Sequence, residues 1–195
     1  MRTYDHQLHK NSKIAFLFSA GMDSTIMLYM LLKQLPESGS TLDIYTCAKT
    51  DGSVIYVSPL LRKIALKLDI PIHSLRSTLI GDGRMRHDLI VSTAVANLLP
   101  HYDYVYLATN PTEIIEADNI MIPVRKFSKN PKIVDSFETF SKTEILDLYI
   151  QHSAVDLLPY THTCTEVQIG RCDVCYQCRE RALAFSKLQL TDTLA

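Results

Sequence analysis

Lys13-Ile-Ala-Phe-Leu-Phe18 and the segment that follows it, Ser19-Ala-Gly-Met-Asp-Ser-Thr25, decide the fold of this chain. The first segment is a short apolar run, which is typical of a strand buried in a parallel sheet. The second is rich in small residues and leads into the apolar stretch 26–35, which predicts a helix that ends at Pro36. A strand, a small-residue loop and a helix in this order predict the start of an α/β fold.

The rest of the chain continues this alternation. Further strands are predicted at 42–48, 70–75 and 103–109, and further helices at 57–68, 88–99 and 141–151. Ser141 and Glu144 fit a capping box at the start of the last of these helices. The stretch 110–140 has the least regular pattern, so we expect functional loops there. Strands that alternate with helices predict an open, parallel, five-stranded sheet flanked by helices.

Composition indicates a globular protein of 195 residues, of which 47% are hydrophobic and 21% charged. We expect an α/β domain over 1–160 and a cysteine-rich segment over 161–185 packed on it. The formal net charge of −1 argues against a nucleic-acid binder that relies on a broad basic surface. Residues 1–13 lack the apolar core of a secretory signal, and no apolar run approaches the roughly 20 residues that cross a bilayer. We therefore expect a cytoplasmic protein without membrane contact.

The small-residue loop has the chemistry of an anion-binding site. Ligands of open parallel sheets bind beyond the carboxyl ends of the strands, where this loop is expected to lie. Ser19, Ser24 and Thr25 offer hydroxyl donors, and the start of the helix adds free N–H groups and a positive dipole. These features suit pyrophosphate, although the loop is neither a Walker loop nor a dinucleotide fingerprint. The alternative is an ordinary strand-to-helix turn in which Asp and Ser side chains cap the helix.

Four of the five cysteines lie close together near the C-terminus with the spacing C-x7-C-x2-C-x2-C: Cys164, Cys172, Cys175 and Cys178. In a reducing compartment, clustered cysteines are metal ligands rather than disulfides. Four thiolates can surround one tetrahedral Zn²⁺ with Zn–S distances of about 2.3 Å, which predicts one structural zinc ion. An iron–sulfur cluster is the competing occupant. Cys47 stands alone in a predicted strand and is expected to be a core residue.

The loop also resembles that of a known superfamily. Ser-Gly-Gly-x-Asp-Ser is the pyrophosphate loop of the N-type ATP pyrophosphatases, and the loop after the first strand is similar to it. The resemblance implies a HUP-like (adenine nucleotide alpha hydrolase-like) fold, cleavage of ATP to AMP and pyrophosphate, and a substrate activated as an adenylate. It implies that Mg²⁺ acts through Asp23 and that the loop binds the nucleotide through Ser19, Ala20, Gly21, Met22, Asp23, Ser24 and Thr25. Ala20 replaces a family glycine, and we expect its methyl group to be tolerated if the backbone is not at positive φ.

Further motifs resemble one family within that superfamily. The pattern from Cys164 to Phe185, C-x7-C-x2-C-x2-C-x2-Arg-Ala-x-Ala-Phe, is similar to the C-terminal end of the 7-cyano-7-deazaguanine synthase (QueC) family. Lys142, in the helix start Ser-Lys-Thr-Glu-Ile, and Arg84, in a Gly-Arg pair, also match motifs of that family. The matches occur in the family's order and span most of the chain.

This second resemblance implies an ATP-dependent ligase. ATP would adenylate the carboxylate of 7-carboxy-7-deazaguanine, a purine-like acid, and ammonia would displace AMP to give the amide or, after a second adenylation, the nitrile. The expected catalytic residues are Asp23, Ser24, Arg84 and Lys142. Arg84 would clamp phosphate or carboxylate oxygens, and Lys142 would neutralise charge on the β- and γ-phosphates; for both, the alternative is a solvated surface charge. Arg181 would either brace the cysteine segment or face the substrate, and related enzymes often form homodimers.

Two stretches depart from the substrate motifs of that family. Residues 45–52 lack its Tyr-Gly-Gln-Arg-His-like motif, and residues 109–118 replace the segment that the family associates with the deazaguanine substrate. Asp173 stands where a glycine is common in the cysteine knuckle. Three alternatives therefore stay open: a tRNA sulfurtransferase of the same superfamily, a conjugating relative that uses an amine on a partner, and a non-catalytic zinc-knuckle protein that binds nucleotide.

Overall fold

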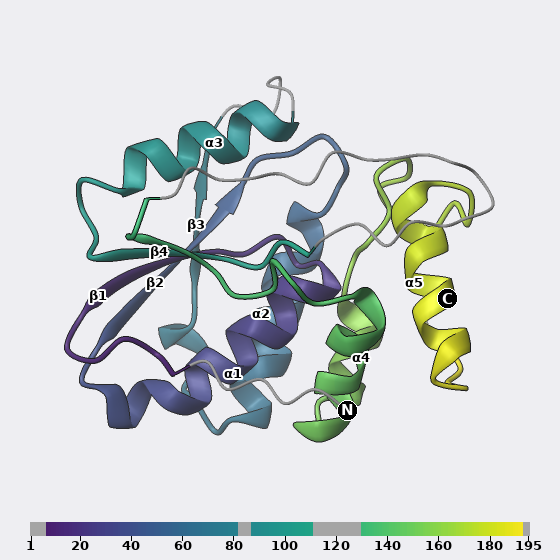
Figure 1. Ribbon diagram of the computed structural model, residues 1–195, viewed down its shortest axis with the longest axis horizontal. Coiled ribbons are helices and arrows are strands. Elements are labelled where there is room, and N and C mark those ends of the chain that lie inside the picture. Colours follow the sequence, from purple (N-terminus) through teal and green to yellow (C-terminus); the bar gives the residue numbers. More distant parts are fainter. Residues whose placement is uncertain (1–6, 82–86, 111–129, 193–195) are drawn as a thin grey trace.

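The computed structural model describes residues 7–81, 87–110 and 130–192 and shows one parallel sheet with helices on both faces (Figure 1). The five strands lie in the order β3-β2-β1-β4-β5, and all neighbours are parallel. The strands are β1 (Lys13–Leu17), β2 (Thr41–Cys47), β3 (Ser77–Ile80), β4 (Tyr104–Leu107) and β5 (Ile133–Asp135). The predicted fold class, an open five-stranded parallel sheet flanked by helices, is confirmed.

The helices of the described residues cover both faces of the sheet. They are α1 (Met22–Ser38), α2 (Val54–Lys67), α3 (His87–Leu98), α4 (Lys142–Gln151) and α5 (Tyr176–Lys187), with the short 3-10 helices η1 (Ile72–Ser74) and η2 (Val155–Tyr160). In Figure 1, α3 lies on one face, α1 and α2 lie on the other, and α5 stands at the outside against α4. Over the described ranges, no helix combines the length and the apolar character that crossing a membrane requires.

Strand β1 contributes to both hydrophobic cores because its side chains alternate between the two faces of the sheet. Ile14 and Phe16 are buried in the larger core, together with apolar residues of α1, α2 and α4. Ala15 and Leu17 face the opposite way, into the smaller core beneath α3. A central strand covered on both faces therefore has an uninterrupted apolar sequence.

The strand predicted at 70–75 is wrong. Pro71 has no N–H to donate to a sheet, and the chain after it forms η1, in which the Ser74 N–H donates to the Pro71 carbonyl at 2.9 Å. The edge strand is instead β3, which begins at Ser77 and pairs with β2 from Ile44 onward. None of its four residues is fully buried, so the apolar pattern that identifies a central strand is missing here.

The predicted end of the first helix at Pro36 is also wrong. Helix α1 begins at Met22, continues through Pro36 and ends at Ser38. Its C-cap is Gly39, whose left-handed backbone (φ 67°) glycine adopts without strain. Because Pro36 stands in the last turn, glycine rather than proline sets the boundary.

The capping box predicted for α4 is confirmed. The Ser141 hydroxyl accepts the Glu144 N–H at 3.2 Å, and the Glu144 carboxylate accepts the Ser141 N–H at 2.8 Å. This reciprocal pair fixes the first helical residue, Lys142, at the carboxyl edge of the sheet. Neither β5 nor α5 is among the elements located from the sequence.

Arg181 is a fully buried cation that holds the C-terminal segment to the rest of the chain. Its guanidinium donates to both carboxylate oxygens of Asp192, at 2.7 and 3.1 Å. It also donates to the hydroxyls of Thr161 and Thr163, at 2.7 and 3.0 Å, and to the carbonyl of Leu158, at 3.2 Å. Of its two expected roles, Arg181 therefore has the first, because it braces the cysteine segment from inside the protein.

Replacing Arg181 by Met should lower the free energy of unfolding by about 3 kcal/mol, because several buried acceptors lose their donor. The loss falls at the low end of the range for broken buried ion pairs, since Arg171 still pairs with Asp192. Urea denaturation measures the change, and Lys187→Ala on the exposed side of α5 should change stability by only about 0.5 kcal/mol. Equal losses in both variants would contradict the bracing role.

Candidate active site and metal centre

A cavity of about 340 Å³ opens at the carboxyl ends of the central strands. The strand order reverses between β1 and β4, and ligands of open α/β sheets bind at this switch point. Loops after the strands and the cysteine segment form the polar walls of the cavity. Its apolar floor consists of Leu17, Cys47, Val91 and Leu107. Cys47 is 6% exposed in the smaller core, so its prediction as a core residue is confirmed.

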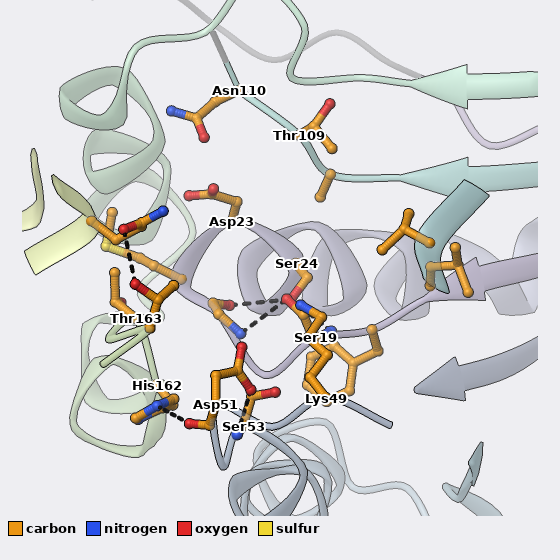
Figure 2. A pocket seen from close by; sticks show the side chains of 18 of the residues that line it. Ser19, Asp23, Ser24, Lys49, Asp51, Ser53, Thr109, Asn110, His162 and Thr163 are labelled. Carbon is orange, nitrogen blue, oxygen red and sulfur yellow. Dashed lines mark hydrogen bonds between the residues drawn. The ribbon is translucent and has the colours of Figure 1, made fainter. Parts of the chain in front are cut away.

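The loop after β1 places the first turn of α1 against the cavity (Figure 2). Gly21 is the N-cap residue of α1, and no side chain caps it. The helix cap by an Asp or Ser side chain, expected if this loop were an ordinary turn, is therefore absent. The N–H groups of the first turn and the positive end of the helix dipole can serve an anion instead.

The serine hydroxyls of the loop hold it in a compact turn. Ser19 Oγ and Ser24 Oγ lie 3.0 Å apart, and Ser24 Oγ donates to the Gly21 carbonyl at 3.2 Å. The Gly21 N–H donates to Ser19 Oγ at 3.3 Å. A side chain added at Gly21 would lie 3.2 Å from Ser19 Oγ, so the tight turn suits glycine.

Five of the seven residues predicted to bind the nucleotide line the cavity, namely Ser19, Gly21, Met22, Asp23 and Ser24. The other two side chains are fully buried elsewhere. The Thr25 hydroxyl donates to the Gly21 carbonyl at 2.8 Å, inside the first turn of α1. The Ala20 carbonyl accepts the His162 N–H at 2.8 Å. This hydrogen bond joins the loop to the cysteine segment.

Ala20 adopts a left-handed backbone with φ 57°. The condition expected for tolerating its methyl group, a backbone without positive φ, is therefore not met. Left-handed geometry costs a non-glycine residue about 1–2 kcal/mol, and burial of the methyl group offsets roughly 0.8 kcal/mol of that. Alanine thus adopts the turn that a glycine would form, at a small cost in stability.

Lys142 joins the loop to α5 through a buried ion-pair network. Its ammonium lies 2.6 Å from both carboxylate oxygens of Asp23 and 3.5 Å from Glu180 Oε2. Asn110 accepts from the ammonium at 3.3 Å and donates to Glu180 at 3.2 Å. The Lys142 side chain is 6% exposed, so its interpretation as a solvated surface charge is wrong. Burial lowers the pKa of Lys142, but the Asp23 and Glu180 carboxylates outweigh burial and leave that pKa raised.

Sequence reasoning missed two members of this network. Glu180 is 3% exposed in α5, two residues after Cys178, and its position beside a predicted metal ligand is the one sequence signal that points to it. Asn110 follows β4, at the edge of the sheet where ligands bind. The predicted catalytic Arg84 lies outside the described residues.

The opposite rim of the cavity follows β2. Figure 2 shows Lys49, Asp51 and Ser53 on the far side of the loop from Asp23. The Ser53 N–H donates to the Asp51 carboxylate at 3.0 Å. His162 Nε2 lies 3.1 Å from the Asp51 carbonyl, so the cysteine segment also contacts this rim.

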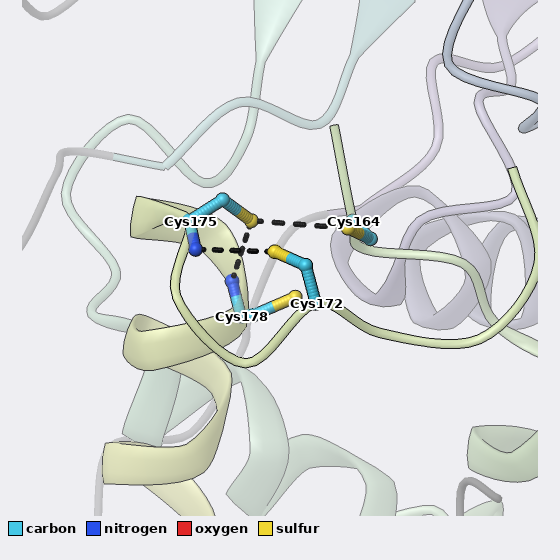
Figure 3. A group of neighbouring side chains, drawn as sticks. All are labelled: Cys164, Cys172, Cys175 and Cys178. Atoms are coloured by element: carbon cyan, nitrogen blue, oxygen red, sulfur yellow. Dashed lines mark hydrogen bonds between the residues drawn. The ribbon is translucent and has the colours of Figure 1, made fainter. Parts of the chain in front are cut away.

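The four clustered cysteines form a candidate metal centre, as predicted (Figure 3). Their sulfur atoms all lie within 4.8 Å of one another, and Cys164 Sγ and Cys175 Sγ are 4.0 Å apart. Cys172, Cys175 and Cys178 surround the start of α5, whose positive dipole end favours thiolates. The arrangement can hold a metal.

Backbone N–H groups stabilise the thiolate forms of two of these cysteines. Burial raises the pKa of the Cys164 thiol, but N–H donors from Glu166 and Val167, each 3.4 Å from Sγ, outweigh burial and lower that pKa to about 7. Burial also raises the pKa of Cys175, and backbone donors including Cys178 N–H again produce a net lowering. Thiolates are the form that binds metal.

The net shift is opposite at Cys178, where burial outweighs the backbone donors and raises the thiol pKa to about 12. The neighbouring Cys175 sulfur adds to this rise. Four sulfur atoms this close cannot all carry a negative charge without a cation among them, which is the condition that a bound metal meets.

Comparison with known proteins gives a fold but no family. No family model matches the chain, and the comparison with curated proteins found no match. The U34-tRNA thiolase NcsA from Methanococcus maripaludis, solved with its 4Fe-4S cluster, has a TM-score of 0.53 and 17% identity over 93% of this chain and 67% of that chain. The FMN adenylyltransferase of Candida glabrata in complex with ATP has a TM-score of 0.43 and 14% identity over 87% and 62%. The likeness to the thiolase, together with the strand order, defines an α/β protein of HUP-like fold.

Replacing Lys142 by Met should lower the free energy of unfolding by about 3–5 kcal/mol, because Asp23 and Glu180 lose their buried counter-ion. A raised lysine pKa contributes stability that is fully present below the ordinary value of 10.5 and is lost as pH rises through the raised value. The difference between the wild type and this variant should therefore stay constant from about pH 6 to 9 and shrink at higher pH.

Chemical denaturation across this pH range measures the difference. The double variant with Asp23→Asn and Lys142→Met should be more stable than Lys142→Met alone, because one unpaired charge is removed with its partner. A Lys142→Met protein as stable as the wild type at neutral pH would show that the network does not hold the site together.

Proposed function

We propose that this protein is an ATP-dependent enzyme that adenylates a carboxylate on a purine-like substrate. The observation that carries the proposal is the uncapped start of α1, which faces a cavity at the switch point of the sheet beside the Asp23–Lys142 pair. Free N–H groups, serine hydroxyls and a buried ammonium together suit the pyrophosphate part of ATP.

The residues around the loop would each have a separate role in binding the triphosphate. Ser19 would donate to a phosphate oxygen, and Ser24 would do so by turning its hydroxyl away from the Gly21 carbonyl. Lys142 would neutralise charge that develops on the departing pyrophosphate. Asp23 lines the cavity and is partly exposed, so its carboxylate fits as a ligand for Mg²⁺ that arrives with ATP. Mg²⁺ bound there would neutralise part of the phosphate charge. We keep Arg84 as a proposed phosphate or carboxylate clamp.

Each chemical step needs positioning rather than a side-chain nucleophile. A substrate carboxylate oxygen attacks the α-phosphorus, the bond from that phosphorus to the β-bridging oxygen breaks, and pyrophosphate leaves. Ammonia then attacks the acyl carbon, AMP leaves with the electron pair of the broken C–O bond, and loss of a proton gives the amide. A second ATP can adenylate the amide oxygen, after which loss of AMP and a proton gives the nitrile.

The resemblance of the lysine, arginine and cysteine motifs supports 7-carboxy-7-deazaguanine as substrate and ammonia as nucleophile. The product would be the amide or the nitrile, 7-cyano-7-deazaguanine. A homodimer and a cytoplasmic location, where thiolates stay reduced, belong to the same proposal. The contact of His162 with Ala20 supports the expectation that 161–185 packs on the α/β domain as part of one unit.

Sulfur spacing supports zinc as the metal. Tetrahedral Zn²⁺ with Zn–S bonds of about 2.3 Å places its sulfur ligands about 3.8 Å apart. Cys164 Sγ and Cys175 Sγ are 4.0 Å apart, and no pair among the four exceeds 4.8 Å. A 4Fe-4S cluster inserts a cube of iron and sulfide between its thiolates and would hold them farther apart. Four thiolates would also complete the coordination of zinc, which suits a structural ion.

A tRNA thiolase is the second candidate function. The observation in its favour is the shared fold with NcsA, a U34-tRNA thiolase that carries a 4Fe-4S cluster. The sulfur spacing and the net charge of −1 favour the first proposal, since tRNA binding relies on basic surface. An assay must also separate two further candidate functions, a conjugating relative and a non-catalytic nucleotide-binding protein.

An assay with ATP, Mg²⁺, ammonium and 7-carboxy-7-deazaguanine should yield AMP, pyrophosphate and a nitrile or amide product identified by mass spectrometry. Asp23→Asn should lower the rate at least about 100-fold, because it removes the carboxylate proposed to bind Mg²⁺ at the phosphates. Metal analysis of the same protein should find zinc without iron or acid-labile sulfide.

The possible outcomes separate the candidate functions. AMP formation that requires tRNA and a sulfur donor, with iron in the protein, would replace the first proposal by the thiolase. AMP formation that requires an amine on a partner protein would indicate a conjugating enzyme. Nucleotide binding without AMP formation under any of these conditions would leave a binding protein.

A further inference from the structure

One part of the cavity wall that the cysteine segment supplies is polar and uncharged. Thr163, Thr165, Tyr176 and Gln177 line the cavity there, and none of them carries a charge at neutral pH. Glu180 of the same segment also lines the cavity, but its carboxylate is paired with Lys142. The rim across the loop differs, because it carries Lys49 and Asp51. A neutral heterocycle that needs hydrogen bonds but no counter-ion therefore fits this uncharged part of the wall better than the charged rim.

Gln177 has unused hydrogen-bonding capacity at this wall. Its carbonyl oxygen accepts from the Thr165 hydroxyl at 3.3 Å, a weak contact. Within the described part of the chain, its amide NH₂ donates to no partner. A carboxamide presents one donor and one acceptor side by side, which is the pattern that pairs with a ring N–H next to a C=O.

Building on the proposed function, we propose that Gln177, supported by Thr165, recognises the base of the acceptor substrate: a fused heteroaromatic lactam whose adjacent ring N–H and C=O pair with the carboxamide. The pairing leaves the apolar floor at the strand ends for the adenosine of ATP. It also places the acceptor between the phosphate loop and the cysteine centre, where its carboxylate can approach the α-phosphate.

The place of Gln177 in the sequence links base recognition to the metal centre. Gln177 lies in the first turn of α5, between the ligands Cys175 and Cys178. The Cys178 N–H donates to Cys175 Sγ at 3.4 Å, so the backbone on either side of Gln177 is held by the sulfur cluster. A metal bound there would fix the position of the carboxamide, which makes Gln177 a specificity residue on a rigid turn.

Isothermal titration calorimetry with the metal-loaded protein tests this inference by measuring two probes separately, 7-carboxy-7-deazaguanine and magnesium α,β-methylene ATP. Gln177→Ala should weaken binding of the deazaguanine at least about tenfold, since a good bidentate pair discriminates by that amount or more. Gln177→Glu keeps the shape of the side chain but loses the NH₂ donor, and should weaken binding similarly. Both variants should bind the ATP analogue within about twofold of the wild type.

Val174→Ala, a change at an exposed position on the same turn, is the matched control and should alter neither affinity.

The outcomes distinguish this inference from the proposed function. Unchanged deazaguanine affinity in both Gln177 variants would overturn the inference and leave the proposed function intact. No deazaguanine binding to the wild type would overturn the inference together with the proposed substrate. A loss of ATP-analogue affinity instead would assign Gln177 to the adenine and also overturn it. A wild type that does not bind the ATP analogue would contradict the proposed function, whereas loss of deazaguanine binding in the variants would still support the role of Gln177.

Discussion

The buried contact between the Lys142 ammonium and the Asp23 carboxylate is the interaction on which the site depends. It joins residues 119 positions apart and brings the start of α4 against the start of α1. Glu180 extends the contact to α5, so one ammonium connects the loop after β1, the sheet edge and the cysteine segment. A buried cation between two carboxylates is stable only when all three are held in place, so this network also fixes the cavity wall.

Further contacts place the cysteine centre beside the cavity rather than at a remote position. His162 donates to the carbonyl of Ala20, and Cys164, two residues later, lines the cavity. Arg181 holds the segment from behind through Asp192 and two threonines. The cysteine segment therefore forms one wall of the cavity, and a metal that orders the cysteines would also order that wall.

Much of this could be predicted from sequence, because the informative patterns are local. The apolar run before Ser19 indicates a central strand, the small residues after it indicate the loop, and the cysteine spacing indicates the metal centre. Features set by tertiary contacts were not accessible: the exposed edge strand β3 has no apolar pattern, and Glu180 is buried only because α5 packs against α4. Ala20 shows the same limit, since nothing in its own residue type reveals a left-handed backbone.

A crystal structure with magnesium and α,β-methylene ATP tests the central claim most directly, because it locates the phosphates without relying on turnover. The account predicts that the β- and γ-phosphates lie within hydrogen-bonding distance of the first-turn N–H groups of α1 and of the Ser19 and Ser24 hydroxyls. Phosphates bound on another surface, with the start of α1 left to solvent, would contradict it.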